Sequence, residues 1–150
     1  MNIDLSGRTA LVTGSTRGIG RAIAESLATA GANVAVVGRD ITRAEEAAAA
    51  ISPNARGFAC DVGDIASVTA LIEAAEKEFG AIDILVNNAG LTRDNILFRI
   101  KDDDWDTVLD ANLRGAFLLV RAVSRGMIKR RWGRLGYGLA VLFVFATAMH

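Results

Sequence analysis

The chain has 150 residues, a length that fits a single domain with a sizeable buried core. Its 17 basic and 17 acidic side chains give no net field toward nucleic acid or an anionic membrane, so neither partner is expected. Cys60 is the only cysteine and can form no internal disulfide, which is typical of a reducing cytoplasm. Residues 1–14 lack the basic and apolar runs of a secretory signal, so we expect a cytoplasmic protein.

Short apolar runs alternate with longer helical patterns through the first 90 residues. Four runs rich in Val, Ile, Leu and Ala predict strands buried on both faces of a parallel sheet, namely Thr9–Thr13, Asn33–Val37, Gly57–Cys60 and Ile82–Asn87. The segments between them predict three helices, Ile19–Ala30, Thr42–Ile51 and Ile65–Phe79. This alternation indicates right-handed crossovers and an α/β fold with a doubly wound parallel sheet.

A fourth helical pattern covers residues 103–129, with a break near its start left open. Its apolar positions recur at i, i+3 and i+4 and predict one buried stripe, made of Trp105, Val108, Leu109, Asn112, Leu113, Ala116, Phe117 and Val120. Asn112 is the polar member of this stripe. Burying an amide without hydrogen bonds costs about 1–3 kcal/mol, and periodicity alone leaves open whether this residue has a structural or a functional role.

Three glycines mark the junction of the first predicted strand and helix, in the sequence TGSTRGIG. A helix N-terminus offers unpaired N–H donors and partial positive charge to a phosphate. In such a loop Gly14 turns the chain, Gly18 admits a pyrophosphate, and Gly20 lets the helix pack on the strand. A tight turn alone also uses glycines, but this loop opens the first βαβ unit, where dinucleotide-binding loops lie. We therefore predict a dinucleotide site.

The residues after the second strand, VVGRD, bear on which dinucleotide binds. NAD-binding domains place an acidic residue on the ribose 2′-OH about 20 positions beyond the glycine loop. Here Arg39 precedes Asp40, and a guanidinium pairs well with a 2′-phosphate. Arg17 in the glycine loop offers a second positive charge. NADP is favoured over NAD; in the alternative, Arg39 is solvated and Asp40 turns inward.

Together these motifs resemble the short-chain dehydrogenase/reductase family. The resemblance rests on TGSTRGIG, on Asp61-Val62, on NNAG at residues 87–90 and on Asn112, in this order within residues 1–134. Two stretches, DILVNNAGLTRDNILFRIKDDDWDTVLDANLRGAF and RGMIKRRWGR, are most similar to bacterial 3-oxoacyl-acyl-carrier-protein reductases.

The resemblance implies that residues 1–134 are the NADP-binding Rossmann portion of an oxidoreductase of fatty acid biosynthesis. Its substrate would be a 3-oxoacyl group on acyl carrier protein, reduced by NADPH, and no metal is expected. The implied cofactor-binding residues are Gly14, Ser15, Arg17, Gly18, Ile19, Gly20, Arg39, Asp61, Val62, Asn88, Ala89 and Gly90. Asn112 is the implied catalytic residue, which helps to hold a water in a proton relay. Family members usually form homotetramers.

The resemblance also implies a docking site for the acidic carrier protein at Lys129, Arg130 and Arg131. Electrostatic steering by such a cluster would raise the association rate. A solvated helix C-terminus, where basic side chains are favoured by the helix dipole, explains the same cluster equally well.

The family's other catalytic groups, a serine and a Tyr-x3-Lys pair, are not found in the sequence. Tyr137 is the only tyrosine and is followed four positions later by Val141, while an uninterrupted count from Arg134 places Ala140 where the serine is expected. A phenol acts as a general acid only when nearby positive charge lowers its pKa. We therefore expect this chain alone to be inactive. The alternatives are a non-catalytic NADP-binding module and an unstable remnant of a frame-shifted gene.

Residues 135–150 form an apolar tail that diverges from the family. The run Leu135–Met149 is shorter than the roughly 20 residues that span a membrane, which argues against an anchor. LAVLFVF offers a makeshift fifth strand, whereas Gly136 and Gly138 weaken the preceding segment. The favoured interpretation is that the reading frame or gene model departs after Arg134. The sheet would then end after the fourth or fifth strand, and its uncovered apolar surface would lower solubility.

Overall fold

The computed structural model describes residues 3–90 and 99–137, in which five parallel strands form one sheet. The strands are β1 (Thr9–Thr13), β2 (Asn33–Gly38), β3 (Ala55–Ala59), β4 (Ile84–Asn87) and β5 (Arg134–Tyr137). Their order in the sheet is β3-β2-β1-β4-β5, so the direction of winding reverses between β1 and β4. Ligands of such sheets bind beyond the carboxyl ends of the strands at this reversal. The predicted doubly wound Rossmann architecture is confirmed.

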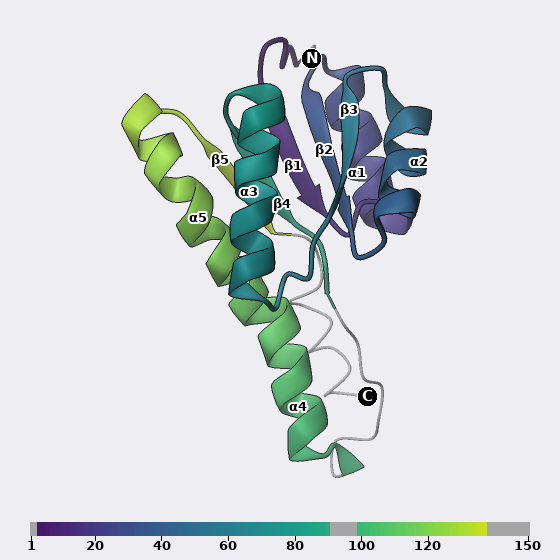
Figure 1. The fold of residues 1–150 in the computed structure, drawn as a ribbon, viewed down its shortest axis with the longest axis vertical. Coiled ribbons are helices and arrows are strands. Elements are labelled where there is room, and N and C mark those ends of the chain that lie inside the picture. Colours follow the sequence, from purple (N-terminus) through teal and green to yellow (C-terminus); the bar gives the residue numbers. More distant parts are fainter. Residues whose placement is uncertain (1–2, 91–98, 138–150) are drawn as a thin grey trace.

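The helices cover both faces of this sheet (Figure 1). α1 (Gly18–Thr29) and α2 (Ile41–Ile51) pack on one face, and α3 (Ile65–Phe79) packs on the other together with α5 (Gly115–Arg130). α4 (Asp102–Leu109) projects beyond the carboxyl ends of the strands (Figure 1). The first four predicted strands and the first three predicted helices are all present, with ends that differ by at most two residues.

Two apolar clusters, one on each face, form the core. Leu11 and Leu85 of the sheet pack with Leu119 of α5 on the first face. Val12 and Val34 pack with small residues of α1 and α2 on the second face. Each fully buried Leu or Val side chain contributes about 1.5–3 kcal/mol. All five residues of β1 are buried, as expected for the central strand of a helix-covered parallel sheet.

A polar cluster ties β5 to the sheet at the amino ends of the strands. The backbone N–H of Arg134 donates to the carbonyl of Asp83 over 2.9 Å. The buried carboxylate of Asp83 accepts from the backbone N–H of Thr9 at 3.0 Å and pairs with Arg8 at 3.5 Å. The Arg8 guanidinium in turn lies over the Trp132 ring, 3.8 Å from its centre. These contacts set the start of β5 beside β4.

β5 lies in the segment whose glycines were expected to weaken a strand. Gly136 pairs with Val86 in the parallel ladder, and a Cβ there would make only ordinary contact with the Val86 side chain, at 3.7 Å. The strand also crosses the proposed boundary at Arg134. The alternative strand LAVLFVF, at residues 139–145, and the serine position Ala140 lie outside the described residues.

The helical region 102–130 is continuous and contains a π-helical segment, η2 (Asp110–Arg114), between α4 and α5. The irregularity therefore lies within the helix rather than near its start. A π-turn inserts extra backbone and rotates the following face. The prediction of one buried stripe is therefore right only in part: Val108, Asn112 and Ala116 are buried, whereas Trp105, Leu113 and Phe117 are exposed. The buried side of α5 carries Ala116 together with Leu118, Leu119, Val123 and Met127.

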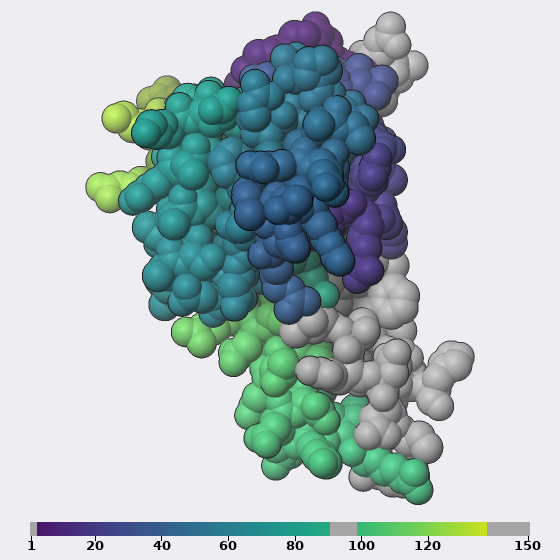
Figure 2. All heavy atoms as spheres, turned by 45° about the vertical axis from the view of Figure 1, so that its right-hand side comes forward, coloured from purple at the N-terminus to yellow at the C-terminus, as the bar shows by residue number. Residues whose placement is uncertain are grey.

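In the space-filling view α2 and α3 form part of a continuous surface, and α4 projects below it (Figure 2). Among the helices in residues 3–90 and 99–137, none has the length and apolar character needed to cross a membrane.

Candidate functional site

A pocket of about 750 Å³ opens where the loops after β1, β2, β3 and β4 meet. Nucleotide-sized ligands fill pockets of roughly 300–1,000 Å³. Eleven of the twelve residues predicted to bind a cofactor line it, namely Gly14, Arg17, Gly18, Ile19, Gly20, Arg39, Asp61, Val62, Asn88, Ala89 and Gly90. The sequence motifs therefore converge in space on one cavity.

The glycine loop has the geometry expected of it. Gly14 and Gly18 adopt left-handed backbone conformations, with φ of +63° and +59°. A Cβ on Gly18 would meet no other atom within 4 Å, so the loop backbone is open at this point. A Cβ on Gly20 would collide with the carbonyl of Gly14 and the side-chain nitrogen of Asn88. The loop can therefore take this shape only with glycine at position 20.

α1 differs from the next two helices at its N-terminus. Asp40 caps α2 by accepting the backbone N–H of Arg43 at 3.1 Å, and Asp64 caps α3 by accepting that of Ser67 at 2.9 Å. α1 begins after Arg17, whose side chain makes no cap hydrogen bond, and its first turn carries no acidic residue. The first N–H groups of α1 thus keep their partial positive charge at the pocket, which favours a phosphate group.

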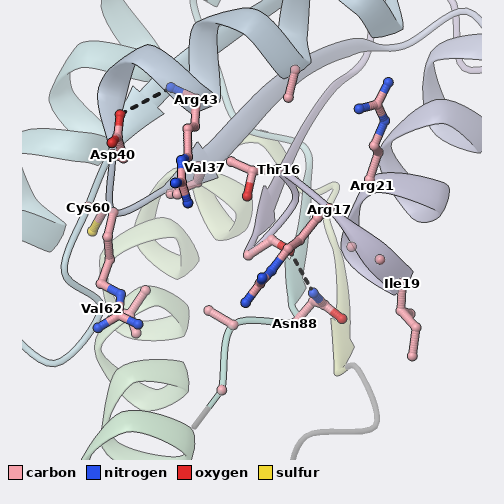
Figure 3. Close-up of a pocket in the computed structure, with 18 of the residues that line it drawn as sticks. Thr16, Arg17, Ile19, Arg21, Val37, Asp40, Arg43, Cys60, Val62 and Asn88 are labelled. Carbon is pink, nitrogen blue, oxygen red and sulfur yellow. Dashed lines mark hydrogen bonds between the residues drawn. The ribbon is translucent and has the colours of Figure 1, made fainter.

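Four arginines line the same pocket: Arg17, Arg21, Arg39 and Arg43. Arg17 extends across its middle and Arg43 reaches toward it from α2, whereas Arg21 points away (Figure 3). Asp40, the acidic residue nearest to an NAD-type ribose position, has one carboxylate oxygen committed to the α2 cap. The arrangement favours a ligand with an additional phosphate near Arg39.

The loop after β4 is joined to the glycine loop by hydrogen bonds. The hydroxyl of Thr13 accepts the backbone N–H groups of Asn88 at 3.0 Å and Ala89 at 2.9 Å. The side-chain amide of Asn88 donates to the carbonyl of Gly14 at 3.1 Å (Figure 3). Four neighbouring residues from two distant parts of the chain therefore form one rigid wall of the pocket.

Ser15 is the one predicted cofactor-binding residue that does not line the pocket. Its side chain is fully buried, and its hydroxyl donates to the carbonyl of Val12 at 2.6 Å and accepts the backbone N–H of Val37 at 3.0 Å. It thus ties the glycine loop to β2 from behind. A role in direct contact with the cofactor stays a prediction.

The turn after β3 closes the opposite end of the pocket. The Asp61 carboxylate accepts the backbone N–H of Gly63 at 3.0 Å, which orients the carboxylate within the turn. Burial raises the pKa of the adjacent Cys60 thiol, a hydrogen bond from Ser67 opposes this, and the Asp61 and Asp64 carboxylates raise it further. Cys60 therefore adds a neutral wall next to an acidic turn.

The predicted catalytic and docking residues lie at different ends of the fold. Asn112 is buried in η2, and its neighbour Ala111 lines the pocket. π-helical turns occur frequently at functional sites. The basic cluster Lys129–Arg131 instead lies at the end of α5, near the amino ends of the strands, where Arg130 donates to the carbonyl of Ile82 at 2.7 Å.

Tyr137 lies at the carboxyl end of β5, paired in register with Asn87, and is 60% exposed. Neither Tyr137 nor any lysine lines the pocket formed by the described residues.

Sequence reasoning missed several lining residues, among them Thr16, Val37, Arg43 and Ala111. Arg43 could have been predicted from the sequence. Asp40 follows the end of β2 and caps α2, so the first turn of α2, which contains Arg43, must lie beside the ribose position. Ala111 had none, because the π-turn that directs it toward the pocket leaves no mark in the periodicity.

Comparison with known proteins agrees with this geometry. Residues 8–135 match the short chain dehydrogenase family. The chain is 45% identical over 133 residues to the 3-oxoacyl-acyl-carrier-protein reductase FabG of Escherichia coli K12, and 49% identical over 137 residues to that of Vibrio harveyi. Each match covers 89% of this chain and 54% of the relative, so the chain spans about half the length of these reductases.

Solved structures give the same result. A gluconate 5-dehydrogenase from Burkholderia cenocepacia, in complex with NADP and tartrate, superposes with a TM-score of 0.85 at 40% identity. The match covers 91% of this chain and 55% of the dehydrogenase. A putative short-chain alcohol dehydrogenase from Sinorhizobium meliloti superposes equally well, at 41% identity, over 91% of this chain and 56% of that structure.

Proposed function

We propose that this chain, which belongs to the short chain dehydrogenase family, is the NADPH-binding portion of a 3-oxoacyl-acyl-carrier-protein reductase. The observation that carries the proposal is the pocket itself. It combines the uncapped N-terminus of α1 with arginines at the end of β2 and in the glycine loop. These are the groups that a pyrophosphate and a ribose 2′-phosphate require.

In this proposal each wall of the pocket binds one part of NADPH. The first turn of α1 holds the pyrophosphate, Arg39 and Arg17 hold the 2′-phosphate, and the Asp61 carboxylate accepts the adenine amino group. The backbone of Ala89 and Gly90 lies along the dinucleotide. NADPH would supply the hydride. The hydrogen bonds that join Asn88 to Thr13 and Gly14 fix the positions, relative to each other, of the two loops that would bind it.

The substrate is proposed to be a 3-oxoacyl group on acyl carrier protein, because bacterial reductases with that specificity are 45–49% identical over the matched residues. Asn112, buried next to the pocket wall, is proposed to help hold a water for proton delivery. On the family resemblance alone, the exposed basic cluster Lys129–Arg131 is proposed to dock the carrier protein, although it lies at the opposite end of the strands from the pocket, and the protein is proposed to assemble into a homotetramer.

A second candidate is a module that binds NADPH without turnover. It rests on the described cofactor pocket, to which the loops after all of the first four strands contribute. Inactivity of the chain by itself stays a prediction. Both candidates require NADPH binding, which is therefore the property to test first.

Binding is tested by titrating the chain with NADPH and with NADH and following nicotinamide fluorescence. We expect tighter binding of NADPH. Arg39→Ala should weaken NADPH binding by about ten- to a hundredfold and leave NADH binding nearly unchanged, because it removes a charge-assisted hydrogen bond to the 2′-phosphate. Arg56→Ala is the matched control, since Arg56 pairs with Glu78 on the surface at 3.1 Å, away from the pocket. If Arg39→Ala weakened the binding of NADPH and NADH equally, Arg39 would not be the residue that binds the 2′-phosphate.

A further inference from the structure

Asp61 and Val62, the first two residues of the turn 61–64, line the pocket, yet the conformation of this turn depends on a residue outside the pocket lining, Ser67 in the first turn of α3. We propose that Ser67 is a positioning residue for adenine recognition, which acts by fixing the backbone at Asp61. This inference rests on the proposed function, because it concerns the part of the site assigned to the adenine of NADPH.

Ser67 makes three hydrogen bonds that together determine its place. Its hydroxyl accepts the backbone N–H of Asp61 at 2.9 Å and donates to the Cys60 sulfur at 3.6 Å. Its own backbone N–H donates to the Asp64 carboxylate at 2.9 Å. The donation to sulfur uses the hydroxyl hydrogen, so an oxygen lone pair is left for the N–H of Asp61.

The rest of the turn is closed by the chain itself. The backbone N–H of Asp64 donates to the carbonyl of Asp61 at 3.1 Å, and that of Gly63 donates to the Asp61 carboxylate Oδ1 at 3.0 Å. On the other side the turn packs against α5, where a Cβ on Gly115 would lie 2.9 Å from the carbonyl oxygen of Val62. The turn is therefore enclosed between the Ser67 hydroxyl and the start of α5.

These contacts determine where the free oxygen of Asp61 lies. Oδ1 is occupied by Gly63, which leaves Oδ2 to accept the adenine amino group. The position of Oδ2 follows from the backbone at Asp61, and Ser67 holds that backbone from outside the ligand site. Loss of the Ser67 hydroxyl should therefore weaken the discrimination of adenine from other bases, rather than phosphate binding at the far end of the pocket.

Hydrogen exchange tests the structural step without any cofactor. In Ser67→Ala the amide N–H of Asp61 loses its acceptor, and we expect its exchange, followed by NMR, to become about five- to tenfold faster. Thr69→Ala is the matched control, because the Thr69 hydroxyl donates to the carbonyl of Ile65 on the same helix and does not reach the turn. Unchanged exchange at Asp61 in Ser67→Ala would overturn the inference whatever the cofactor result.

Cofactor preference tests the functional step. The probes are NADPH and its reduced hypoxanthine analogue, in which a 6-oxo group replaces the adenine amino group. The unaltered chain should prefer NADPH by about three- to tenfold, the value of one hydrogen bond. We expect this preference to fall toward one in Ser67→Ala, to persist in Thr69→Ala, and to return in Ser67→Thr, which restores a hydroxyl. If part of the variant protein were unfolded, the apparent affinity for both ligands would fall equally, and the ratio of the two affinities would not change.

The outcomes separate the two proposals. Faster exchange with a lost preference supports the positioning role, and faster exchange with an intact preference overturns it. If the unaltered chain binds neither probe, the proposed function fails and the adenine role fails with it, while the exchange experiment still reports whether Ser67 holds the turn.

Discussion

β1 and β5 are both short parallel strands of the same sheet, yet their surroundings differ. β1 lies between β2 and β4, with helices on both faces, and all five of its residues are buried. β5 pairs with β4 alone among the described strands, and three of its four residues are exposed. Within the described residues, the flank of the sheet that carries the pocket is thus well packed, and the flank at β5 has much less cover.

Buried polar groups show the same difference. Ser15, beside β1 and β2, is fully buried and both donates and accepts a hydrogen bond. Asn87, at the end of β4 beside β5, is also buried, but neither side-chain atom has a hydrogen-bond partner among the described residues. Natural proteins rarely leave buried polar atoms unpaired. Among the described residues, hydrogen bonds therefore hold the buried Ser15 side chain at the pocket but not the buried Asn87 side chain beside β5.

The largest predicted effect comes from adding one methyl group on each flank. Gly20→Ala places a Cβ against the Gly14 carbonyl and the Asn88 side chain. We expect a loss of about 1–3 kcal/mol in the free energy of unfolding, typical of an overpacked site, and a fall in NADPH affinity of at least about tenfold. Gly136→Ala in β5 meets only Val86 and Leu85 at 3.7–3.9 Å and should be neutral. Denaturant unfolding measures the stability of the two variants, and NADPH titration measures their affinity. Equal destabilisation by Gly20→Ala and Gly136→Ala would contradict the difference in packing between the two flanks.

A loss of stability of comparable size, without a predicted change in NADPH affinity, is expected from truncating the two buried polar residues. Ser15→Ala leaves the N–H of Val37 buried without its partner, which costs about 1–3 kcal/mol. Asn87→Ala breaks no hydrogen bond among the described residues, so its loss should be smaller by about 1 kcal/mol, even though it removes more atoms. Urea denaturation of the two variants provides the measurement. A larger loss for Asn87→Ala would show that its amide is hydrogen bonded in solution and that the flanks are more alike than this structure shows.

The sequence predicted the pocket flank far better than the β5 flank, for physical reasons. Gly14 follows from local backbone geometry and Gly20 from the close approach of the Gly14 carbonyl within the same motif, so the motif indicates both the turn and its place beside β1. Buried strands leave continuous apolar runs that are read directly. The contacts at β5 cannot be predicted in this way, because Arg8, Asp83 and Trp132 are far apart in sequence and no local pattern indicates that they meet.

Two further features were hidden for related reasons. The π-turn at Asp110–Arg114 changes the helical period, so a constant spacing placed Leu113 and Phe117 in the core when both are exposed. Ser67 reads in the sequence as an ordinary residue of a capped first turn. Its contact with Asp61 depends on how the chain returns after β3.

The smallest predicted effect on stability concerns the exposed apolar residues of α5. Phe117 is 57% exposed and Ile128 is 75% exposed, so each already contacts water in this chain. Replacing both by Gln removes apolar surface from the exterior and should change the free energy of unfolding by no more than about 0.5 kcal/mol per site. Because exposed apolar surface promotes association, the same variant should increase the monomeric fraction seen by size-exclusion chromatography with light scattering.

Leu119→Gln is the matched control, since Leu119 lies on the opposite, buried side of the same helix, with 1% of its surface exposed. Burying an amide there without partners should destabilise the fold by several times more than both surface changes together, because the apolar burial is lost as well. If Phe117→Gln and Ile128→Gln instead destabilise the isolated chain as much as Leu119→Gln, these two side chains must be covered in solution. The β5 flank would then be as well packed as the pocket flank.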